Sequence, residues 1–458
     1  MVAIPFGFNA YRRNVGQFSE TRLVNQYAEI GSDKSFRLIG RPGLAEAYSL
    51  ASGPVYGVYA QPGSFNGDLF AVAGGGLYRQ GSLVGPLSTA SRVSMASSEL
   101  ELLVATGASM YRYDGTNIAT VSFPDNAGEN SVVYFAGLFI VARTGTEKFY
   151  WSAVLDGSTW DSLSFASAER KPDNLVGIIV VGDEIWMGGE NSWEFWVSTG
   201  NADAPFERVE GRVYDRGVIN RDSMVNFDNT AAWVGQDKIV YRGGPVPQRI
   251  SDYGVEERLA ASADSEIHVW TFKWNGHEFL VVNTDQGSFA YDVATQQWAE
   301  FKSWNRAGWR AHLGCMVGST VYAGDDTNGT IWTLEQDQLL DGTDAIERIS
   351  SAIIHLTGKP QLLNSVHVDI SPGQTPSLTG QGSSPVVELR LSRDAGKTFG
   401  NWRSAPIGGQ GDYRRRSFWT RCGLVDEPGL VLEFRTTDPA PWTLSGVRIN
   451  ELAGGRSR

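Results

Sequence analysis

The sequence is poor in cysteine and has no long apolar run. Its two cysteines, Cys315 and Cys422, lie far apart among 458 residues, which excludes a disulfide framework and the closely spaced cysteines of a zinc site. No stretch of about 18 apolar residues occurs, so no membrane-spanning helix is predicted. The opening residues, MVAIPFGFNAYRRNVGQF, contain no apolar signal-peptide segment. We therefore expect the chain to be made and folded in a reducing cytosol, wherever it later acts.

The sequence also lacks the short motifs of common catalytic and cofactor sites. It contains no GxSxG elbow, no Walker loop, no HExxH, no CxxC and no GxGxxG after a strand-like run. Its histidines are scattered without metal-ligand spacing, which predicts structural roles for them. We therefore predict no catalytic, cofactor-binding or metal-binding residues, and a protein that is not an enzyme. The histidines are His268, His277, His312, His355 and His367.

The chain is acidic, with a formal net charge of −12. A charge of this sign argues against a non-specific nucleic-acid binder, which is normally basic. Two basic clusters depart from the trend, Arg12–Arg13 and Arg414–Arg416. They are either solvated loops and strand ends, or contacts to an acidic partner or to DNA.

Antiparallel strands are the dominant prediction. The 53 glycines and the 11% aromatic content favour an all-β protein with many turns. From Phe149 to Trp196, short runs rich in Val, Ile, Phe, Trp and Tyr alternate with Gly, Asp and Asn turns. Runs of this kind are typical of antiparallel strands.

One unit recurs along the chain: an apolar strand, a second apolar strand, an aromatic strand and an outer strand, joined by turns. Successive first strands lie 36 to 47 residues apart, the period of four-stranded propeller blades. The alternative is an ordinary β-sandwich with hairpins that are alike by chance, but the shared order of three strands in every unit favours a propeller. The first strands are marked by Gly57, Val93, Val132, Gly177, Met224, Ile267 and Ala311.

A propeller accounts for the residue types in this unit. Blades stacked around an axis bury both faces of each sheet and leave only short edges. The first strands line a narrow axis, which suits their Gly and Ala, and the aromatic strands fill the wider space farther out. We therefore expect four tryptophans to be buried between blades: Trp186, Trp193, Trp233 and Trp332.

The chain is predicted to be all-β and divided into three parts. Residues 1–50 form an N-terminal arm, 51–340 a β-propeller of about seven blades, and 343–458 a C-terminal β-sandwich-like domain that makes a platform or ring. The last blade has no evident outer strand, so Ala45–Leu50 is expected to supply one and close the ring. A short helix is expected over Val255–Ala263.

Polar loops and turn motifs connect the predicted strands. Ser371–Pro385 and Gly408–Arg416 are long loops that we expect to reach neighbouring molecules. Ser392–Phe399 (SRDAGKTF) matches the Asp-box pattern of sialidase-like propellers, and Ser152–Trp160 matches it loosely. Because the box is a turn device, it carries no catalysis. Asp325–Gly329 lacks the spacing of a calcium loop, so we expect a tight turn there too.

Several motifs, in shared order, resemble the tail-hub proteins of short-tailed bacteriophages, also called packaged-DNA stabilisation proteins or tail accessory factors. The resemblance covers most of the chain and is best over about 53–240 and at the C-terminal end. The motifs are GGGLYR at 74–79, RVSMA at 92–96, YRYDG at 111–115, GGENSWEFWVSTG at 188–200 and PWTLSG at 441–446.

The resemblance implies a virion structural protein that is synthesised in the host cytoplasm and located in the tail. Such proteins form a hexameric, nozzle-like hub below the portal and its adaptor. The hub extends the channel that double-stranded DNA passes through, helps to retain packaged DNA until genome ejection, and anchors tail fibres or spikes. The family has no catalytic residues or cofactors to carry over. An acidic channel wall would let DNA slide, because repulsion prevents sticking.

Two functions of other classes remain open. One is a carbohydrate-active, sialidase-like enzyme, which needs two carboxylates at a defined separation that sequence alone cannot place. The other is a propeller binding module that grips a peptide or a glycan over its central axis.

Overall fold

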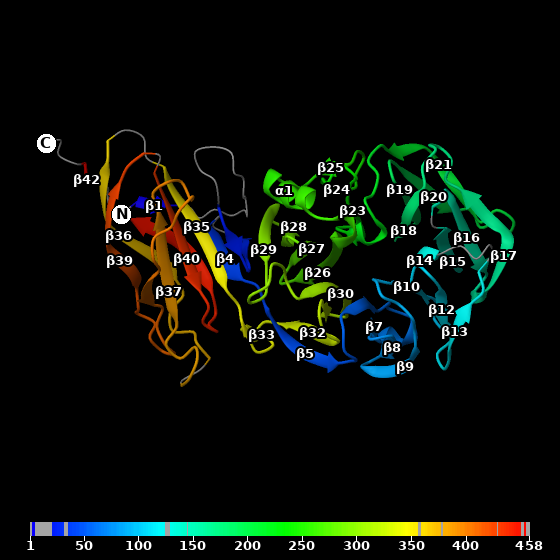
Figure 1. The fold of residues 1–458 in the computed structure, drawn as a ribbon, viewed down its shortest axis with the longest axis horizontal. Coiled ribbons are helices and arrows are strands. Elements are labelled where there is room, and N and C mark those ends of the chain that lie inside the picture. The colour runs from blue at the N-terminus through cyan, green and yellow to red at the C-terminus, as the bar shows by residue number, and fades with distance from the viewer. Residues whose placement is uncertain are drawn as a thin grey trace.

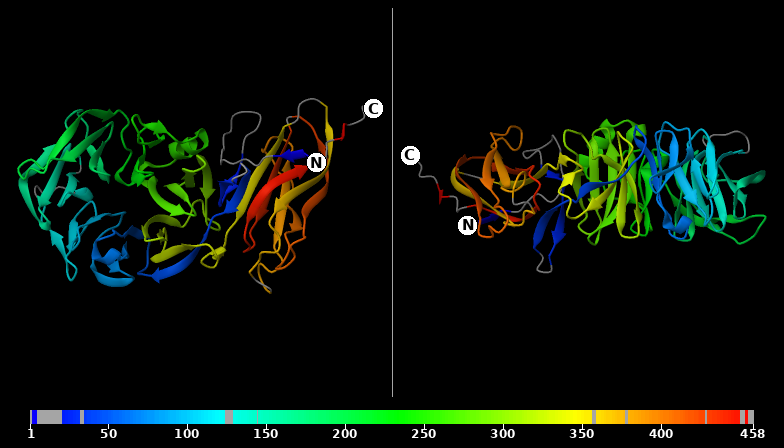
Figure 2. Two further views of the ribbon diagram at one scale, coloured as in Figure 1. Left: turned by 180° about the vertical axis from the view of Figure 1, so that it is seen from behind. Right: turned by 90° about the horizontal axis from the view of Figure 1, so that it is seen from below.

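The computed structural model describes residues 2–4, 21–31, 35–123, 129–143, 145–355, 359–376, 379–427, 429–449 and 453–454. The cluster Arg12–Arg13 lies outside them. Figure 1 shows two parts arranged along the longest axis, a ring of small sheets and a layered pair of sheets. The two parts remain distinct in both views of Figure 2.

The ring is a β-propeller. Within the described residues it has seven blades, each with four antiparallel strands paired in order, which confirms the predicted fold class. First strands of successive blades contact one another around the axis, and every predicted marker lies in one of them or directly before it. The blades are β6 (Val55–Tyr59) to β9 (Ser82–Pro86) with β7 (Phe70–Ala73) and β8 (Gly76–Arg79); β10 (Ser94–Ser97), β11 (Leu102–Ala105), β12 (Met110–Tyr113) and β13 (Ile118–Val121); β14 (Glu129–Phe135), β15 (Leu138–Arg143), β16 (Lys148–Ala153) and β17 (Asp156–Ser167); β18 (Leu175–Val181), β19 (Glu184–Gly189), β20 (Trp193–Ser198) and β21 (Phe206–Tyr214); β22 (Met224–Phe227), β23 (Thr230–Val234), β24 (Val240–Arg242) and β25 (Gln248–Arg249); β26 (His268–Trp274), β27 (His277–Thr284), β28 (Gly287–Asp292) and β29 (Gln297–Phe301); and β30 (Ala311–Val317), β31 (Thr320–Asp325) and β32 (Thr330–Glu335).

The seventh blade takes its fourth strand from the other end of the described chain. β5 (Gly43–Ser49) pairs antiparallel with β32, from Gly43 opposite Glu335 to Ser49 opposite Thr330. The Leu50 N–H donates to the Gly329 carbonyl over 2.8 Å and continues the contact past the strand. This strand begins two residues before the segment expected from the sequence and extends to Ser49.

Packing explains the residue types of the repeat. A Cβ atom on Gly177 would lie 1.9 Å from Cε of Met224, so glycine in this first strand makes room for the methionine of the next blade. Farther out, Trp193 of the fourth blade packs on Trp233 of the fifth, with ring centroids 5.1 Å apart. Both indoles are fully buried, and Trp186 and Trp332 are buried as well, as predicted.

Helices are few among the described residues. The helix α1 (Tyr253–Ala261) lies where one was expected, two residues earlier along the chain. Asp252 precedes the helix and caps it, because its side chain accepts a hydrogen bond from the Val255 N–H. No helix in the described ranges is long and apolar enough to cross a membrane. Single turns of 3-10 helix occur at η1 (Phe65–Gly67), η3 (Arg221–Ser223) and η4 (Asp264–Glu266).

The second part is a sandwich of two sheets. Its outer sheet has the order β3-β4-β41-β36-β39, with β1 on β41 and β42 on β36, and its inner sheet has the order β2-β35-β40-β37-β38. The alternating residues Leu363, Val366 and Val368 of β36 face the shared core. The strands are β1 (Val2–Ile4), β2 (Leu23–Val24), β3 (Gln26–Ile30), β4 (Phe36–Gly40), β35 (Arg348–His355), β36 (Gln361–Ile370), β37 (Val386–Ser392), β38 (Arg403–Pro406), β39 (Ser417–Val425), β40 (Gly429–Thr436), β41 (Thr443–Ile449) and β42 (Ala453–Gly454).

From the sequence we expected residues 1–50 to form an N-terminal arm. The described residues before Gly43 instead contribute the strands β1 to β4 to the sandwich. β4 pairs with β41 in the outer sheet, and β3 pairs with β4. The buried side chains Tyr27, Ala28 and Leu38 explain this position, because they give the hairpin an apolar face that the sandwich core covers.

A two-residue strand joins the two parts. β2 pairs parallel with β29 of the sixth blade, with Val24 opposite Glu300, and antiparallel with β35 of the sandwich. Blade six and the inner sheet therefore form one nine-stranded sheet. A second short ladder, β33 (Leu340–Asp341) with β34 (Asp344–Ala345), extends the seventh blade beside β5. These pairings fix the orientation of the sandwich relative to the propeller.

Candidate functional site

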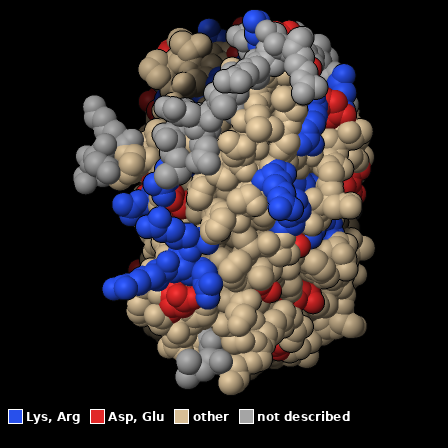
Figure 3. All heavy atoms as spheres, turned by 90° about the vertical axis from the view of Figure 1, so that its left-hand side faces the viewer, with Lys and Arg blue, Asp and Glu red and all other residues tan. Residues whose placement is uncertain are grey.

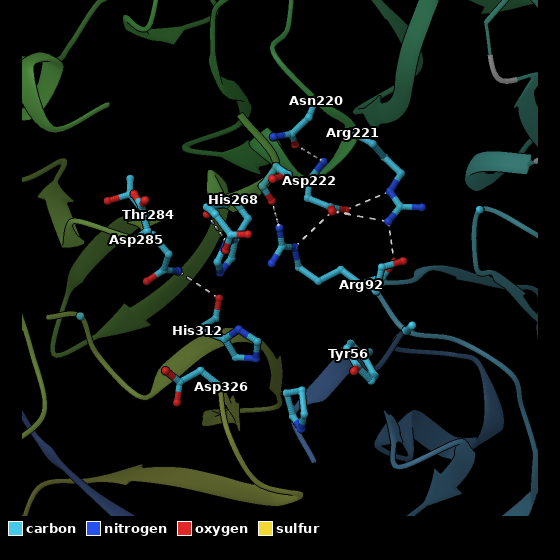
Figure 4. Close-up of a pocket in the computed structure, with 18 of the residues that line it drawn as sticks. Tyr56, Arg92, Asn220, Arg221, Asp222, His268, Thr284, Asp285, His312 and Asp326 are labelled. Atoms are coloured by element: carbon cyan, nitrogen blue, oxygen red, sulfur yellow. Dashed lines mark hydrogen bonds and ion pairs between the residues drawn. The ribbon is translucent and has the colours of Figure 1, made fainter. Parts of the chain in front are cut away.

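One mouth of the propeller axis opens into a cavity of about 1210 Å³, which we call the axial cup. The loops that lead into the first strands and the turns between the second and third strands form its wall, and all seven blades contribute. Figure 4 shows its labelled side chains converging on the axis from separate blades. Most of the residues in its wall are polar or charged, and Asp285 and Glu266 are exposed.

At the bottom of the axial cup, Arg92 and Arg221 form ion pairs with Asp222, and His268 lies beside them. We call these four residues the waist cluster. Arg92 Nε donates to Asp222 Oδ2 over 3.1 Å, and Arg221 Nε donates to Asp222 Oδ1 over 2.9 Å (Figure 4). Arg221 also donates to the Arg92 carbonyl, and Arg92 donates to the Ser265 carbonyl, so blades two, five and six are tied together. Burial opposes ionisation of Asp222, but the two adjacent guanidinium groups outweigh it and lower its pKa.

Beyond the waist cluster lies a second axial cavity of about 570 Å³. Residues of the first strands line it, including the apolar side chains Met95, Met224 and Trp270. The waist cluster borders both cavities. Salt-linked side chains of blades two and five thus lie where the two cavities adjoin.

Two histidines meet at the bottom of the axial cup. The rings of His268 and His312 lie edge to face with centroids 5.5 Å apart. Burial lowers the pKa of His312 to about 4, with a further contribution from the Arg92 guanidinium. The pKa of His268 is lowered well below its ordinary value by burial, by Arg92 and by His312. Both imidazoles are therefore neutral near pH 7.

Sequence reasoning gave these histidines separate structural roles and missed that they are neighbours. The signal was present in the repeat, since His268 directly follows the marker Ile267 and His312 directly follows the marker Ala311. Residues at equivalent positions of successive blades lie side by side around the propeller axis. Within the described ranges, no group of three or more His, Cys, Asp or Glu side chains is placed to hold a metal ion.

The Asp-box segment Ser392–Phe399 is a turn between β37 and β38. Asp394 accepts hydrogen bonds from the Thr398 N–H over 2.8 Å and from the Thr398 hydroxyl over 2.6 Å. Together with the Ser392 hydroxyl, these donors lower the pKa of Asp394 to about 2. The aromatic ring of Phe399 lies under the Arg390 guanidinium. This is the turn role expected for the box.

The segment Asp325–Gly329 is likewise a turn, between β31 and β32. Oδ1 of Asp325 accepts from the backbone N–H groups of Thr327 and Asn328, and its Oδ2 accepts from Arg310 Nε and Trp332 Nε1. Protein donors thus occupy both carboxylate oxygens, which supports the turn expected from the sequence.

The two cysteines are unpaired thiols in the structure. Burial raises the pKa of Cys315 to about 12, and burial also raises that of Cys422. Thiols with raised pKa values are poor nucleophiles, because the thiolate is the reactive form.

A second candidate surface is the outer sheet of the sandwich, at the left of Figure 1. Lys and Arg side chains gather on this end of the molecule, seen face-on in Figure 3. Arg421 and Arg448 are exposed on its strands, and Phe418 and Leu424 are large apolar side chains exposed on β39. We call these four residues the outer face.

The predicted basic cluster Arg414–Arg416 is exposed in the loop before β39. Its loop, Gly408–Arg416, contacts the other long loop, Ser371–Pro385, because the Gly411 N–H donates to the Gly373 carbonyl over 3.2 Å. Tyr413 at their contact is strongly exposed. The two loops form one composite surface, which the sequence did not predict.

Fold and surfaces together define the class of the chain: a closed seven-bladed propeller continued by a two-sheet sandwich, with no cofactor motif in its sequence. A sequence profile described as "Bacteriophage P22 Gp10, beta-propeller" matches residues 2–339, and one described as "Bacteriophage P22 Gp10, beta-sandwich" matches residues 348–451. The chain belongs to the phage P22 Gp10 family.

A curated relative is the "Tail hub protein gp10" of Salmonella phage P22, which is 23% identical over 278 residues. That match covers 56% of this chain and 58% of the relative, so it spans little more than half the length of either.

Solved structures match the chain at low similarity. The extracellular domain of the hybrid two-component system BT3049 from B. thetaiotaomicron is 10% identical with a TM-score of 0.45, covering 93% of this chain and 61% of that one. BamB from Moraxella catarrhalis is 10% identical with a TM-score of 0.40, covering 64% of this chain and 98% of that one. Neither likeness bears on function.

Proposed function

We propose that the protein is a structural component of a phage tail. It forms the hub ring below the portal and adaptor, extends the DNA channel, helps to retain the packaged genome and anchors tail fibres or spikes. The observation that carries this proposal is the match of both halves of the chain, propeller and sandwich, to the phage P22 Gp10 family. Family membership supports a structural, non-enzymatic role in the tail.

The shape of the chain supports a hexameric ring built through the sandwich. A propeller closes on itself and uses up its sheet edges, whereas the sandwich sheets end in β39, β3 and β38 among the described strands. Edge strands of this kind suit a heterologous contact between copies, and such contacts can close into a cyclic ring. The sandwich would make the inner ring and the propellers would project outward.

The charges support the same arrangement. The outer face and the loop Gly408–Arg416 are rich in arginine on a chain of net charge −12, so they suit an acidic neighbour, either another copy or the adaptor. Because salt-linked side chains of blades two and five lie between the two axial cavities, DNA would pass through a channel between subunits. A permanent contact of this type buries more than roughly 2,000 Å².

The experiment is carried out on the particle. Virions are assembled without this protein and compared with wild-type virions for DNA content, DNA leakage and the presence of tails in electron micrographs. The proposal expects heads that fill with DNA but lose it, and that carry no fibres or spikes. Particles that retain the genome and infect normally would overturn it. A monomer in solution would not, because the adaptor ring can supply the template for assembly.

The Asp-box segment Ser392–Phe399 gives no support to the enzyme alternative, because its carboxylate is used in a turn. The binding-module alternative is favoured by a specific observation, the axial cup.

A further inference from the structure

A hairpin turn of blade three exposes two adjacent apolar side chains. Val154 and Leu155 connect β16 to β17, with Ala153 opposite Asp156 on either side of the turn, and they are 69% and 65% exposed. Leu155 also has a φ angle of 57°, in the left-handed region that costs free energy for a leucine. Hairpin turns of two residues favour Gly and Asn instead, because these residues adopt positive φ angles with little strain.

Two-residue turns elsewhere in the described chain follow that preference and contain Gly or Asn at positive φ. Examples are the turns at 74–75, 80–81, 136–137, 228–229 and 275–276. Neither burial nor backbone geometry therefore explains the apolar residues Val154 and Leu155. An exposed apolar residue held in a strained conformation points to a contact with another molecule.

A third exposed apolar side chain, Leu100, lies on the neighbouring blade at the same end of the propeller. It is 73% exposed in the turn between β10 and β11. The residue after it, Glu101, accepts a hydrogen bond through Oε2 from the Gly157 N–H over 2.7 Å. This turn therefore contacts the start of β17, two residues after the turn of blade three. We call Leu100, Val154 and Leu155 the apolar tip.

The surface around the apolar tip is acidic. Glu99 is exposed in one of its two turns. The hydrogen bond with Glu101 and the charges of two further carboxylates raise the pKa of Arg112. Those two carboxylates are Asp114 and Asp156. Among these residues the acids outnumber the base, so the tip suits a partner that has an apolar pocket bordered by Lys or Arg.

The apolar tip lies away from the axial cup and from the sandwich. Its turns connect first to second strands and third to fourth strands, so they lie at the opposite end of the propeller from the turns that form the cup. Figure 1 places β16 and β17 at the end of the molecule away from β36 and β39, and both views of Figure 2 agree. In the proposed ring the sandwich lies inside, so the tip would face outward, away from the basic outer faces of the other copies.

We propose that the apolar tip is a docking site for another tail protein, one whose surface has an apolar pocket bordered by lysine or arginine side chains. This inference rests on the proposed function, because the hub position supplies the partner and directs blade three outward. The three apolar side chains enter the pocket, and the surrounding carboxylates pair with its border. This is the usual arrangement of an interface with an apolar centre and a polar rim.

Site-specific photocrosslinking on assembled virions identifies the occupant of the tip. Val154 is replaced by photoreactive p-benzoyl-phenylalanine, the virions are irradiated, and the crosslinked chains are identified by mass spectrometry. We expect a crosslink to a different tail protein, near a Lys or Arg of that protein. The same replacement at Val246, which is 73% exposed between β24 and β25, should not give this product. A crosslink from position 154 to another copy of this chain, or to no protein, overturns the proposal.

The double variant Val154→Asn with Leu155→Gly separates docking from folding. It removes two apolar side chains of the tip and gives the turn a sequence that favours positive φ, so its thermal midpoint should equal or exceed that of wild type. Virions with this variant should contain the chain and keep their DNA, but hold the crosslinked partner at a level about tenfold lower or less. Val246→Asn, at an equally exposed valine, should leave the protein composition of the virion unchanged.

Glu99→Lys tests the acidic rim and serves as the second variant if the first is not incorporated into virions. Reversal of this exposed charge should lower the partner content severalfold without affecting folding. Wild-type partner content in virions that carry either tip variant overturns the inference. That result leaves the proposed function standing, because the proposed function is tested by genome loss from particles that lack the chain altogether.

Discussion

Arg41 and Asp341 form a buried bidentate ion pair at the junction of the propeller and the sandwich. Nη1 and Nη2 of Arg41 donate to Oδ1 and Oδ2 of Asp341 over 2.8 and 2.7 Å, and neither side chain is appreciably exposed. Arg41 Nε also donates to Asn25 Oδ1, and Ser303 donates to Asp341. The pair thus connects the residue that follows β4 with β33, at the point where β2 joins the two parts.

Asp341→Asn should destabilise the chain severely. The substitution leaves the Arg41 guanidinium buried without its counter-ion, beside Arg348, whose pKa burial and Arg41 lower to about 10. Removing one partner of a buried pair costs about 3 to 5 kcal/mol. Urea unfolding measures this, with Asp215→Asn in the exposed pair with Lys171 as the control, where less than about 1 kcal/mol is expected. Similar losses in both variants would contradict the role of the junction pair.

Removal of residues 1–50 should destabilise the propeller as well as the sandwich. The deletion removes β5, which is the outer strand of the seventh blade, and β1 to β4. A deletion of residues 1–20 also removes β1 but keeps the other four strands, and serves as the control. Differential scanning calorimetry should show a much lower midpoint for the longer deletion. A midpoint equal to that of the full chain would show that ring closure by β5 is dispensable.

Trp193→Ala should cost about 3 to 5 kcal/mol of unfolding free energy, the usual range for a large core aromatic. The indole is fully buried and packs on Trp233 of the next blade, so its loss opens a cavity between blades. Trp304 is 40% exposed, and Trp304→Ala is the matched control with a much smaller loss. A cost below about 1 kcal/mol at Trp193 would instead identify a residue that contributes little to blade packing.

The stability of the chain should fall as the solution is acidified from about pH 6.5 toward pH 4. His312 has a folded pKa of about 4 against an ordinary value of 6.5, mainly because of burial. In this range the unfolded chain binds the proton and the folded chain does not, so the stability present above pH 6.5 is lost as the pH falls. For His312 alone the loss is roughly 3 kcal/mol.

Unfolding in urea at several pH values checks this expectation. His312→Gln removes the titrating group and keeps a side-chain N–H for the Val55 carbonyl, which His312 Nε2 contacts over 2.9 Å. The variant should show a flatter pH profile between pH 4 and 6.5 than wild type. Parallel profiles would mean that His312 does not contribute to the acid sensitivity.

Local sequence patterns predict a large part of this fold. The period of the first-strand markers predicts the propeller, because each blade repeats the same pattern of apolar strands and turns. The glycine at 177 and the tryptophans at 193 and 233 predict a tight axis and wide outer spaces, since side-chain volume follows the radius of the ring. The turn role of Ser392–Phe399 is also predictable, because its hydrogen bonds are made within five residues.

Other features depend on neighbours that are distant in the chain. The hairpin of β3 and β4 has an ordinary strand pattern, and only the sheet order places it beside β41. The two-residue strand β2 is too short to give a periodic signal, yet it joins the two parts. His268 and Asn283 lie opposite each other because β26 and β27 pair in one register. Strands, turns and the blade repeat thus follow from the order of the amino acids, because the forces that form them act between nearby residues. The junction and the axial cup follow from tertiary packing instead, because their contacts form only when the ring and the sandwich close.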